Sequence, residues 1–317
     1  MTNTTIGHNG HQYRVDYNWG SLNPYKYPVN DCHEMVIDAS NRLYMLTNET
    51  HNNILIYDLS GKLLNAWGNN YPGAHGLSIF NDNGIEYLLI SDHVRHQVIK
   101  TTLSGDEIMV MNFPMETGCY AQASQYLPTE TAVAPNGDIY VTDGYGLQYV
   151  IQYNKHGQYI RHWGGAGDED GQFNCVHGIA VDTRAGHPTL IITSRNHNAF
   201  KRFTLEGKFI EKIYLPGSFV CRPVIKDKHL YAAVFRSTTN MNLNSGYITI
   251  LDEHNRIIST PGGTEPIYID NVLQSQHQQE SVFMHPHDVS VDDEGNIYVC
   301  QWKANKTYPL KLNKIKS

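Results

Sequence analysis

Short stretches of alternating apolar and polar residues recur along the chain and are separated by turns. One unit reads strand, turn, strand, and its successive turns lie 44, 52, 50 and 48 residues apart. Alternation with a period of two is typical of half-buried strands, and Gly or Asn supplies the positive φ that hairpin turns need. The pattern therefore predicts a series of β-hairpins. Their turn residues are Gly61, Gly105, Gly157, Gly207 and Asn255.

A second strand–turn–strand unit precedes the first one and occurs six times. Its clear copies span 35–47, 131–143 and 288–300, and its weaker copies span 77–92, 179–194 and 223–235. Two hairpins per repeat give four strands, and four-stranded repeats of about 40 to 50 residues are typical of propeller blades. The sequence predicts an all-β, six-bladed β-propeller with four-stranded antiparallel blades.

The whole chain, 1–317, is predicted to form one propeller domain. The segment 11–20 alternates like a strand and ends in Trp19-Gly20, as other copies end in Trp67-Gly68 and Trp163-Gly164. We expect 11–20 to close the ring as an outer strand of the sixth blade or as a strand paired beside 308–313, because the first and last blades would otherwise leave open edges. A disordered N-terminal arm is the alternative. The segment 261–283 is the longest gap between units and is predicted to be a loop over one face.

Composition narrows the class of protein. Apolar residues make up 40% and charged residues 17% of the chain, and the net charge is -7. No Lys/Arg cluster or membrane-length apolar run is present, the N-terminus has no apolar signal segment, and the five cysteines form no CxxC pair. We expect a cytoplasmic protein that binds a small-molecule substrate and neither nucleic acid nor membrane. The oligomeric state is left open.

Four of the 17 histidines share one register of the repeat. The residue just before the first strand of each blade is expected to point into the central funnel. His75, His177 and His287 hold this position in alternate blades, and three converging imidazoles with an open fourth position are the arrangement of catalytic zinc sites. Solvated histidines without a metal are the alternative. The six residues at this position are His33, His75, Thr129, His177, Arg222 and His287.

A second cation is suggested by the residue that follows His287. Asp288 can turn inward, and the backbone carbonyls of Met35 and Leu77 could join it around calcium. On spacing alone, a solvated carboxylate or a turn cap is the favoured interpretation of Asp288.

Further candidates follow the second strands of the blades. A tyrosine beside a divalent metal can act as a base, and an arginine can bind a carboxylate, which are the roles we assign to Tyr145 and Arg195. Aromatic packing and a surface ion pair are the alternatives. Two extra imidazoles at the mouth, His33 and His285, are candidate acid–base groups. The candidate substrate-binding residues are Arg222, Arg236, His93 and Asn48.

These segments resemble the NHL-type six-bladed propellers, and among them the peptidyl-α-hydroxyglycine α-amidating lyases. The resemblance is carried by 73–100, 141–145 and 286–288. It implies zinc on the three alternate histidines and calcium near Asp288 and the carbonyls of Met35 and Leu77. It also implies Tyr145 as the base and Arg195 as a substrate ligand.

The chain departs from that family at three places. Residues 47–50 contain no arginine where the first blade of the family carries one. Gly146 replaces the cysteine that follows the family's tyrosine, and His285 replaces the methionine beside its last zinc ligand. These differences leave peptide specificity open.

Three functions are compatible with the sequence. The first is a zinc-dependent lyase that cleaves a bond next to a metal-bound hydroxyl in a small anionic substrate. The second is a metal-dependent hydrolase or lactonase, or an eliminase or hydratase, that acts on a sugar-derived substrate. The third is a non-catalytic binding scaffold, which gives no reason for histidines at alternate blades.

Overall fold

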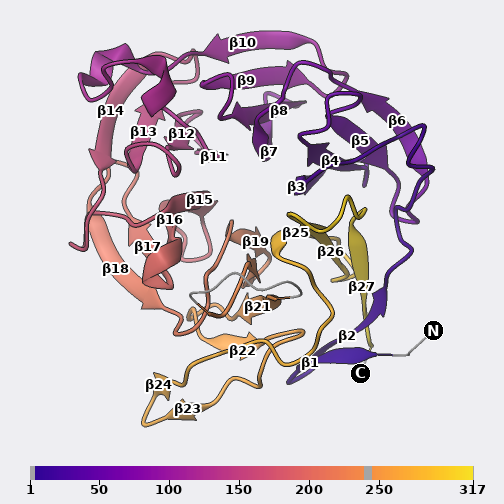
Figure 1. Cartoon of the computed structure of the whole chain (residues 1–317). Coiled ribbons are helices and arrows are strands. Elements are labelled where there is room, and N and C mark those ends of the chain that lie inside the picture. Colours follow the sequence, from indigo (N-terminus) through magenta and orange to yellow (C-terminus); the bar gives the residue numbers. More distant parts are fainter. Residues whose placement is uncertain (1–3, 239–244, 317) are drawn as a thin grey trace.

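Six antiparallel sheets stand around a central axis in a computed structural model that describes residues 4–238 and 245–316 (Figure 1). This arrangement confirms the predicted all-β, six-bladed propeller with four-stranded blades. The first three blades comprise β3 (Cys32–Ile37), β4 (Leu43–Thr47), β5 (Ile54–Tyr57), β6 (Leu63–Trp67); β7 (Ala74–Asp82), β8 (Ile85–Asp92), β9 (Gln97–Thr102), β10 (Glu107–Met111); and β11 (Glu130–Val133), β12 (Ile139–Thr142), β13 (Tyr149–Tyr153), β14 (Tyr159–Gly164). The fourth and fifth comprise β15 (Val176–Asp182), β16 (Thr189–Ser194), β17 (Ala199–Phe203), β18 (Phe209–Tyr214); and β19 (Val224–Lys226), β20 (His229–Val234), β21 (Tyr247–Leu251), β22 (Ile257–Ser259).

The sixth blade joins the two ends of the chain. It contains β25 (Pro286–Val291), β26 (Ile297–Gln301) and β27 (Leu310–Lys314), and β2 (His11–Asp16) pairs antiparallel with β27. A fifth strand, β1 (Thr5–His8), pairs with β2 at the outer edge. The strand from the N-terminal segment is shorter than the predicted 11–20, because the chain turns after Asp16.

Tryptophans connect the outer edges of neighbouring blades. The Trp19 indole donates a hydrogen bond to the carbonyl of Leu59 (3.1 Å), and the Trp67 indole donates to that of Leu103 (3.2 Å). Each ring therefore covers the hairpin turn of the next blade. This contact explains why the Trp-Gly pairs and the turn glycines repeat with the blades in the sequence. The three Trp–Gly contacts are Trp19 with Gly61, Trp67 with Gly105 and Trp163 with Gly207.

The hydrophobic core is divided among the spaces between the blades. Six clusters of buried residues each combine side chains of two neighbouring blades. Tyr44 and Leu46 of the first blade, for example, share a cluster with Leu88 and Ile90 of the second. The apolar side chains thus pack between the blades. The start of each inner strand lies at the axis instead, and the buried residues there are mostly polar.

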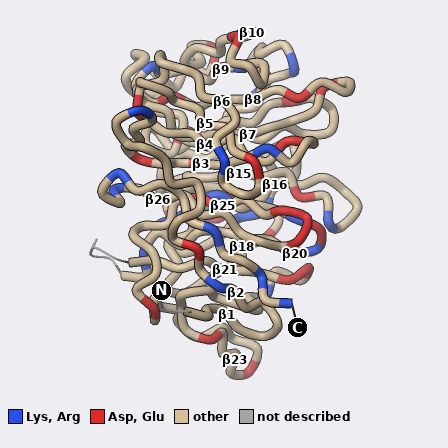
Figure 2. The backbone as a smooth tube through the Cα atoms, turned by 90° about the vertical axis from the view of Figure 1, so that its right-hand side faces the viewer, with Lys and Arg blue, Asp and Glu red and all other residues tan. Residues whose placement is uncertain are grey.

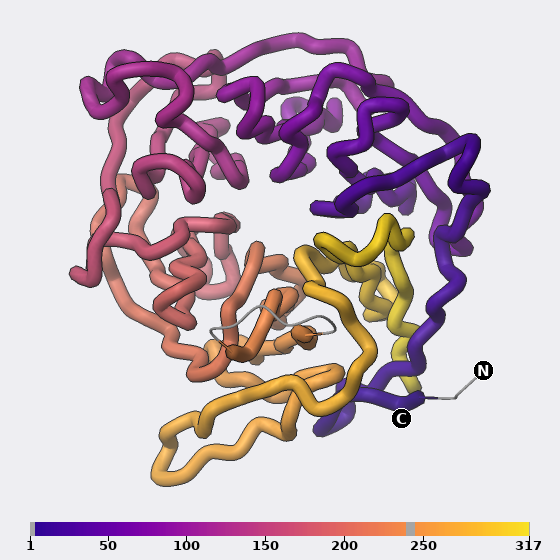
Figure 3. Tube along the Cα trace, viewed as in Figure 1, coloured from indigo at the N-terminus to yellow at the C-terminus, as the bar shows by residue number. Residues whose placement is uncertain are grey.

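The segment predicted as a loop, 261–283, contains a small hairpin. Its strands β23 (Tyr268–Ile269) and β24 (Val272–Leu273) project away from the ring at the lower left of Figure 3. Three short 3-10 helices lie in loops elsewhere: η1 (Met115–Thr117), η2 (Ala123–Gln125) and η3 (Arg195–His197). None of the helices within the described residues has the length and apolar character needed to cross a membrane. Acidic and basic residues are interspersed on the side shown in Figure 2.

Candidate metal centre

Four histidines from four inner strands meet at the axis of the ring. The ring centroids of His33, His75, His177 and His287 lie 4.8 to 5.0 Å apart in five of their six pairings. His75 and His287 form the shared edge, so either His33 or His177 completes a triangle with them. All four side chains are buried, with 1 to 2% of their surface exposed.

A β-bulge accompanies each of these histidines. The pairing of the inner strand with its neighbour shifts register between Cys32 and Glu34, and likewise at the other three histidine positions. A bulge leaves one residue unpaired and redirects its side chain. The histidine and its successor can therefore both lie at the axis, although strict alternation would send them to opposite faces.

Backbone carbonyls fix the orientation of two of the imidazoles. The Nδ1 of His75 lies 2.8 Å from the carbonyl of Thr129, and the Nδ1 of His287 lies 3.0 Å from that of His33. A carbonyl accepts only, so Nδ1 carries the proton and the lone pair is on Nε2. This second-shell arrangement is typical of metal-ligating histidines.

The other two imidazoles have nitrogens without partners among the described residues. Both ring nitrogens of His33 and the Nδ1 of His177 are buried and make no hydrogen bond. Burial lowers the pKa of His33 to about 4 and holds the pKa values of His75, His177 and His287 well below the ordinary value. Uncharged, unpartnered imidazoles are the form in which histidine binds metals.

The geometry supports a metal site and enlarges the predicted set of ligands. The potential ligand atoms of His33, His75 and His287 all lie within 4.8 Å of one another, so these three residues could hold a metal ion. The sequence had assigned His33 to acid–base chemistry and His177 to the metal. His177 remains part of the same cluster through its contacts with His75 and His287.

Tyr145 lies against this cluster. Its hydroxyl is 2.9 Å from the Nε2 of His75 and 3.1 Å from the Nε2 of His177. The residue as a whole is 41% exposed, so part of its ring is open to solvent while its hydroxyl faces the imidazoles. In the metal-free protein, burial raises the pKa of Tyr145, and the charge of Arg195 acts in the opposite direction.

A buried carboxylate holds the loop that presents Tyr145. Asp143 accepts hydrogen bonds from the backbone N–H groups of Leu127 (2.7 Å) and Leu147 (2.6 Å) and from the hydroxyl of Tyr120 (2.8 Å). The sequence analysis did not single out this residue. Its signal is the Asp that ends the second strand directly before the Gly-Tyr pair.

Arg195 and Arg236 lie together on one wall of the funnel. The Arg195 guanidinium donates to the Sγ of Cys221 (3.0 Å) and lies 5.1 Å from the ring centroid of Phe235. Burial and the charge of Arg195 lower the pKa of Arg236. His285 packs against the same phenylalanine, with its ring centroid 5.2 Å from that of Phe235. The structure therefore groups His285 with the arginines.

The remaining mouth residues occupy two different settings. The His93 ring is 6.2 Å from that of His75 and 6.1 Å from that of Tyr145, so His93 borders the cluster. Asn48 instead binds the segment that precedes β3: its side-chain oxygen accepts from the backbone N–H of Asp31 (2.9 Å). Asn48 positions the chain that leads to His33.

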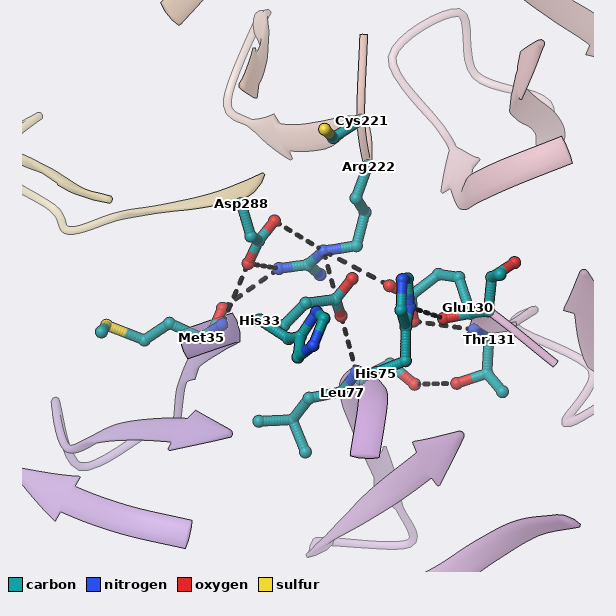
Figure 4. A network of polar contacts seen from close by, with 12 residues as sticks. His33, Met35, His75, Leu77, Glu130, Thr131, Cys221, Arg222 and Asp288 are labelled. Carbon is teal, nitrogen blue, oxygen red and sulfur yellow. Dashed lines mark hydrogen bonds and ion pairs between the residues drawn. The ribbon is translucent and has the colours of Figure 1, made fainter. Parts of the chain in front are cut away.

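The structure changes the interpretation of Arg222, Asp288 and Met35 (Figure 4). The Nε and Nη2 of Arg222 donate to the two carboxylate oxygens of Asp288 (3.0 and 2.7 Å), and Nη2 also donates to the carbonyl of Met35 (3.1 Å). Arg222 was expected to bind substrate, and this placement does not fit that role. The expected calcium ligands do not fit either, because the guanidinium already contacts two of the three, the Asp288 carboxylate and the Met35 carbonyl.

Two buried glutamates complete this group of charges, which the sequence analysis missed. The Nε of Arg222 lies 3.7 Å from a carboxylate oxygen of Glu34 and 3.7 Å from one of Glu130. Each glutamate directly follows the register position, after His33 and Thr129. Their signal was an acidic residue directly after the register position in the first and third blades, where the second and fourth blades have Gly76 and Gly178.

The model of a family described as "6-bladed beta-propeller" matches residues 132–287. The chain is a six-bladed β-propeller by sequence as well as by structure. Among solved structures, it resembles a gluconolactonase from Xanthomonas campestris (TM-score 0.63, 10% identity, 98% of this chain and 97% of that chain). It also resembles a streptogramin B lyase (TM-score 0.59, 15% identity, 91% and 95%). At these identities the likeness shows the fold of this propeller alone.

Curated relatives confirm the resemblance to amidating enzymes at low identity. The propeller is 24% identical over 276 residues to mouse peptidyl-glycine alpha-amidating monooxygenase, which covers 82% of this chain and 26% of that protein. It is 28% identical over 109 residues to peptidyl-alpha-hydroxyglycine alpha-amidating lyase 1 of Drosophila melanogaster. That alignment covers 33% of this chain and 19% of the fly protein. The matched region thus spans about a quarter or less of these relatives.

Proposed function

We propose that this propeller is a metal-dependent lyase that breaks a bond next to a hydroxyl group in a small anionic substrate. One observation carries the proposal: the Tyr145 hydroxyl contacts both His75 (2.9 Å) and His177 (3.1 Å). The phenolic oxygen of Tyr145, a potential proton acceptor, therefore lies beside ring nitrogens of a buried, uncharged histidine cluster. The distant similarity to amidating enzymes supports the same reaction type.

The donor set fits a transition metal, for which we propose zinc. His75, His177 and His287 would hold it, and His33 lies close enough to join them. Imidazole nitrogens suit zinc and its neighbours better than calcium or magnesium. The bound metal would supply a Lewis acid that lowers the pKa of a substrate hydroxyl.

The residues of the chain supply the remaining chemistry. Tyr145, acting as the phenolate, accepts the proton of the substrate hydroxyl. The electron pair left on that oxygen forms a carbonyl while the adjacent carbon–heteroatom bond breaks, and the leaving group departs with the bonding electrons and takes up a proton. The Tyr145 phenol formed in the first step, or solvent, supplies that proton.

The two arginines of the funnel wall provide an anion site. Arg195 and Arg236 lie close enough for the charge of Arg195 to lower the pKa of Arg236, so a ligand anion would relieve their mutual repulsion. Guanidinium groups bind carboxylates through paired hydrogen bonds. We therefore expect a carboxylate or a similar anion near the scissile bond.

A hydrolase or lactonase is the second candidate. The unpartnered imidazole of His33 favours it, because general acid–base chemistry on an activated water needs such a group. The fold resemblance to a gluconolactonase is compatible with this reaction.

A substrate screen with zinc-loaded and metal-depleted protein tests the proposal. The panel contains α-hydroxyglycine peptides, other hydroxylated conjugates with a carboxylate, and sugar lactones. A lyase releases a new carbonyl compound, which a hydrazine reagent detects, whereas a lactonase releases acid. Metal-dependent carbonyl release would support the lyase, and acid release alone would favour the second candidate. Turnover that is the same with and without metal would contradict both.

A further inference from the structure

A compact layer of charged side chains lies next to the histidine cluster on the same axis (Figure 4). Asp288, Glu34 and Glu130 have 0 to 1% of their surface exposed, and the Arg222 guanidinium faces all three carboxyl groups. These four residues come from four different blades. We call them the axial charge layer.

Hydrogen bonds of the layer connect it to the blades. Asp288 also accepts from the backbone N–H of Met35 (2.9 Å), and Glu34 accepts from that of Leu77 (2.6 Å). Each carboxylate thus binds the inner strand of the following blade. The carboxylates of this layer therefore help to hold neighbouring blades together at the axis.

The layer needs a cation because its carboxyl groups have almost no access to water. Burial raises the pKa of Glu34, Glu130 and Asp288, and the charge of Arg222 lowers the pKa of each. Burying a carboxylate without a partner costs free energy, and a bidentate contact with a guanidinium compensates much of that cost. Arg222 is the cation that the described structure supplies.

Close packing of the backbone brings Arg222 to this position. A Cβ on Gly178 would lie only 2.5 Å from the Cα of Arg222, so the fourth and fifth blades can approach this closely only with glycine there. The residue after the neighbouring ligand His75 is also a glycine, but the residue after His287 is Asp288. The guanidinium therefore contacts the acidic residues that the first, third and sixth blades carry directly after this position.

If Arg222 were removed, the remaining oxygen atoms of the layer would resemble a metal-ion site. The Oε1 of Glu34 and the Oε2 of Glu130 are buried and accept no hydrogen bond from a donor group elsewhere in the described structure, although the two carboxyl groups interact with each other. Together with the Asp288 carboxylate and the Met35 carbonyl, they form the oxygen-only set that calcium prefers. A cavity of about 430 Å³, bordered by Arg222, Asp38 and Asp292, adjoins the layer and offers a path for ions.

We propose that Arg222 is a built-in cation, which replaces the calcium ion implied by the family resemblance and makes the propeller independent of calcium. Removal of the guanidinium should then uncover a calcium site formed by Asp288, Glu34, Glu130 and the carbonyl of Met35. The proposal does not depend on the lyase activity, since the charge layer and the histidine cluster use different residues.

The experiment compares melting temperatures of metal-depleted variants with and without millimolar calcium. The wild-type chain should not respond to calcium. Arg222→Ala should melt several degrees lower, because it leaves buried carboxylates unpaired, and calcium should restore most of that loss. Equilibrium dialysis with radioactive calcium should show one bound ion in Arg222→Ala and none in the wild type. Magnesium, which tolerates such a site poorly, should restore less.

Two controls make the result specific. Arg184→Ala removes another arginine from an ion pair, with Asp182 (2.9 Å), and should lower the melting temperature without any calcium response. The double variant Arg222→Ala/Asp288→Ala should bind no calcium, which would locate the ion in this layer. If Arg222→Ala does not fold, Arg222→Gln is measured in the same way.

The outcomes separate the proposal from its rivals. A wild-type protein that binds calcium and melts higher with it would overturn the built-in cation. A folded Arg222 variant that ignores calcium would overturn it as well. Neither readout uses turnover, so a failed substrate screen leaves this test intact.

Discussion

The histidine cluster and the axial charge layer are neighbours on the axis, yet they solve opposite problems. The charge layer contains its own cation, and Arg222 contacts three buried carboxyl groups from other blades. The histidine cluster contains no counterpart, and His33 and His177 keep nitrogens without partners within the described structure. The comparison teaches that one site carries a counter-charge from the polypeptide, whereas the other is uncharged and presents nitrogens that can bind a ligand.

The difference follows from the residues that the alternating blades place at the axis. In the second and fourth blades the ligand histidine is followed by glycine, and in the first and third blades the register position is followed by glutamate. The three candidate zinc ligands come from even-numbered blades. Arg222 and the glutamates come from odd-numbered blades, and Asp288 shares the sixth blade with His287. This division suggests separate tests of the two sites.

The largest effect is expected from the two histidines that belong to both triangles. His75→Ala and His287→Ala should each reduce bound zinc from about one equivalent to nearly none, because neither leaves three mutually close imidazoles in the cluster. His33→Ala and His177→Ala should weaken binding and retain some metal, since three histidines remain. Elemental analysis after equilibration with zinc measures this, with the exposed His51→Ala as a control. Full metal content in His75→Ala would remove the metal from this cluster.

The next effect concerns turnover. Tyr145→Phe should reduce the rate on whichever substrate the screen identifies by about 100-fold or more, the usual scale for a general base. Metal content and melting temperature should stay near the wild-type values, because Phe keeps the ring that borders the funnel. Tyr214→Phe, at a 57% exposed position on the fourth blade, is the matched control. A rate equal to the wild type would exclude Tyr145 as the base, and loss of metal would show that its role is structural.

The smallest effect is a difference in how the histidine cluster and the axial charge layer make the stability of the protein depend on pH. The folded pKa of His33, about 4, lies below that of an unfolded histidine, about 6.5, so the unfolded chain binds more protons between these values. The metal-free protein should therefore lose stability as the pH falls from 6.5 toward 4. His33→Gln should reduce this loss by up to about 1.4 kcal/mol per pH unit.

The carboxyl groups of the charge layer should act in the opposite direction. The pKa of Glu34 is raised in the folded state, so its contribution is present at low pH and is lost as the pH rises through the folded pKa. Glu34→Gln should remove that contribution and leave a steeper loss of stability on acidification. Urea unfolding of the metal-free variants at several pH values measures both slopes. Equal slopes in the wild type and His33→Gln would contradict the assignment for His33.

Much of the site could be predicted because the repeat gives each residue a register. His75, His177 and His287 were recognised as alternate-blade residues at one position, and Tyr145 as the residue after a second strand. The structure places the four side chains in one cluster. The role of Arg222 could not be predicted, because its register position alone does not say whether the guanidinium turns to the mouth or to an acid in another blade.

The sequence by itself determined the number of blades and the positions that reach the axis. Periodicity and turn residues are local, so they can be recognised without knowing which segments meet. Only the tertiary structure decided which of those residues act together. The bulges that turn His33 and Glu34 toward the same axis, and the contact of Arg222 with Asp288, 66 residues away, arise when the ring closes. Charge pairing across that ring depends on distances between blades, which no single repeat encodes.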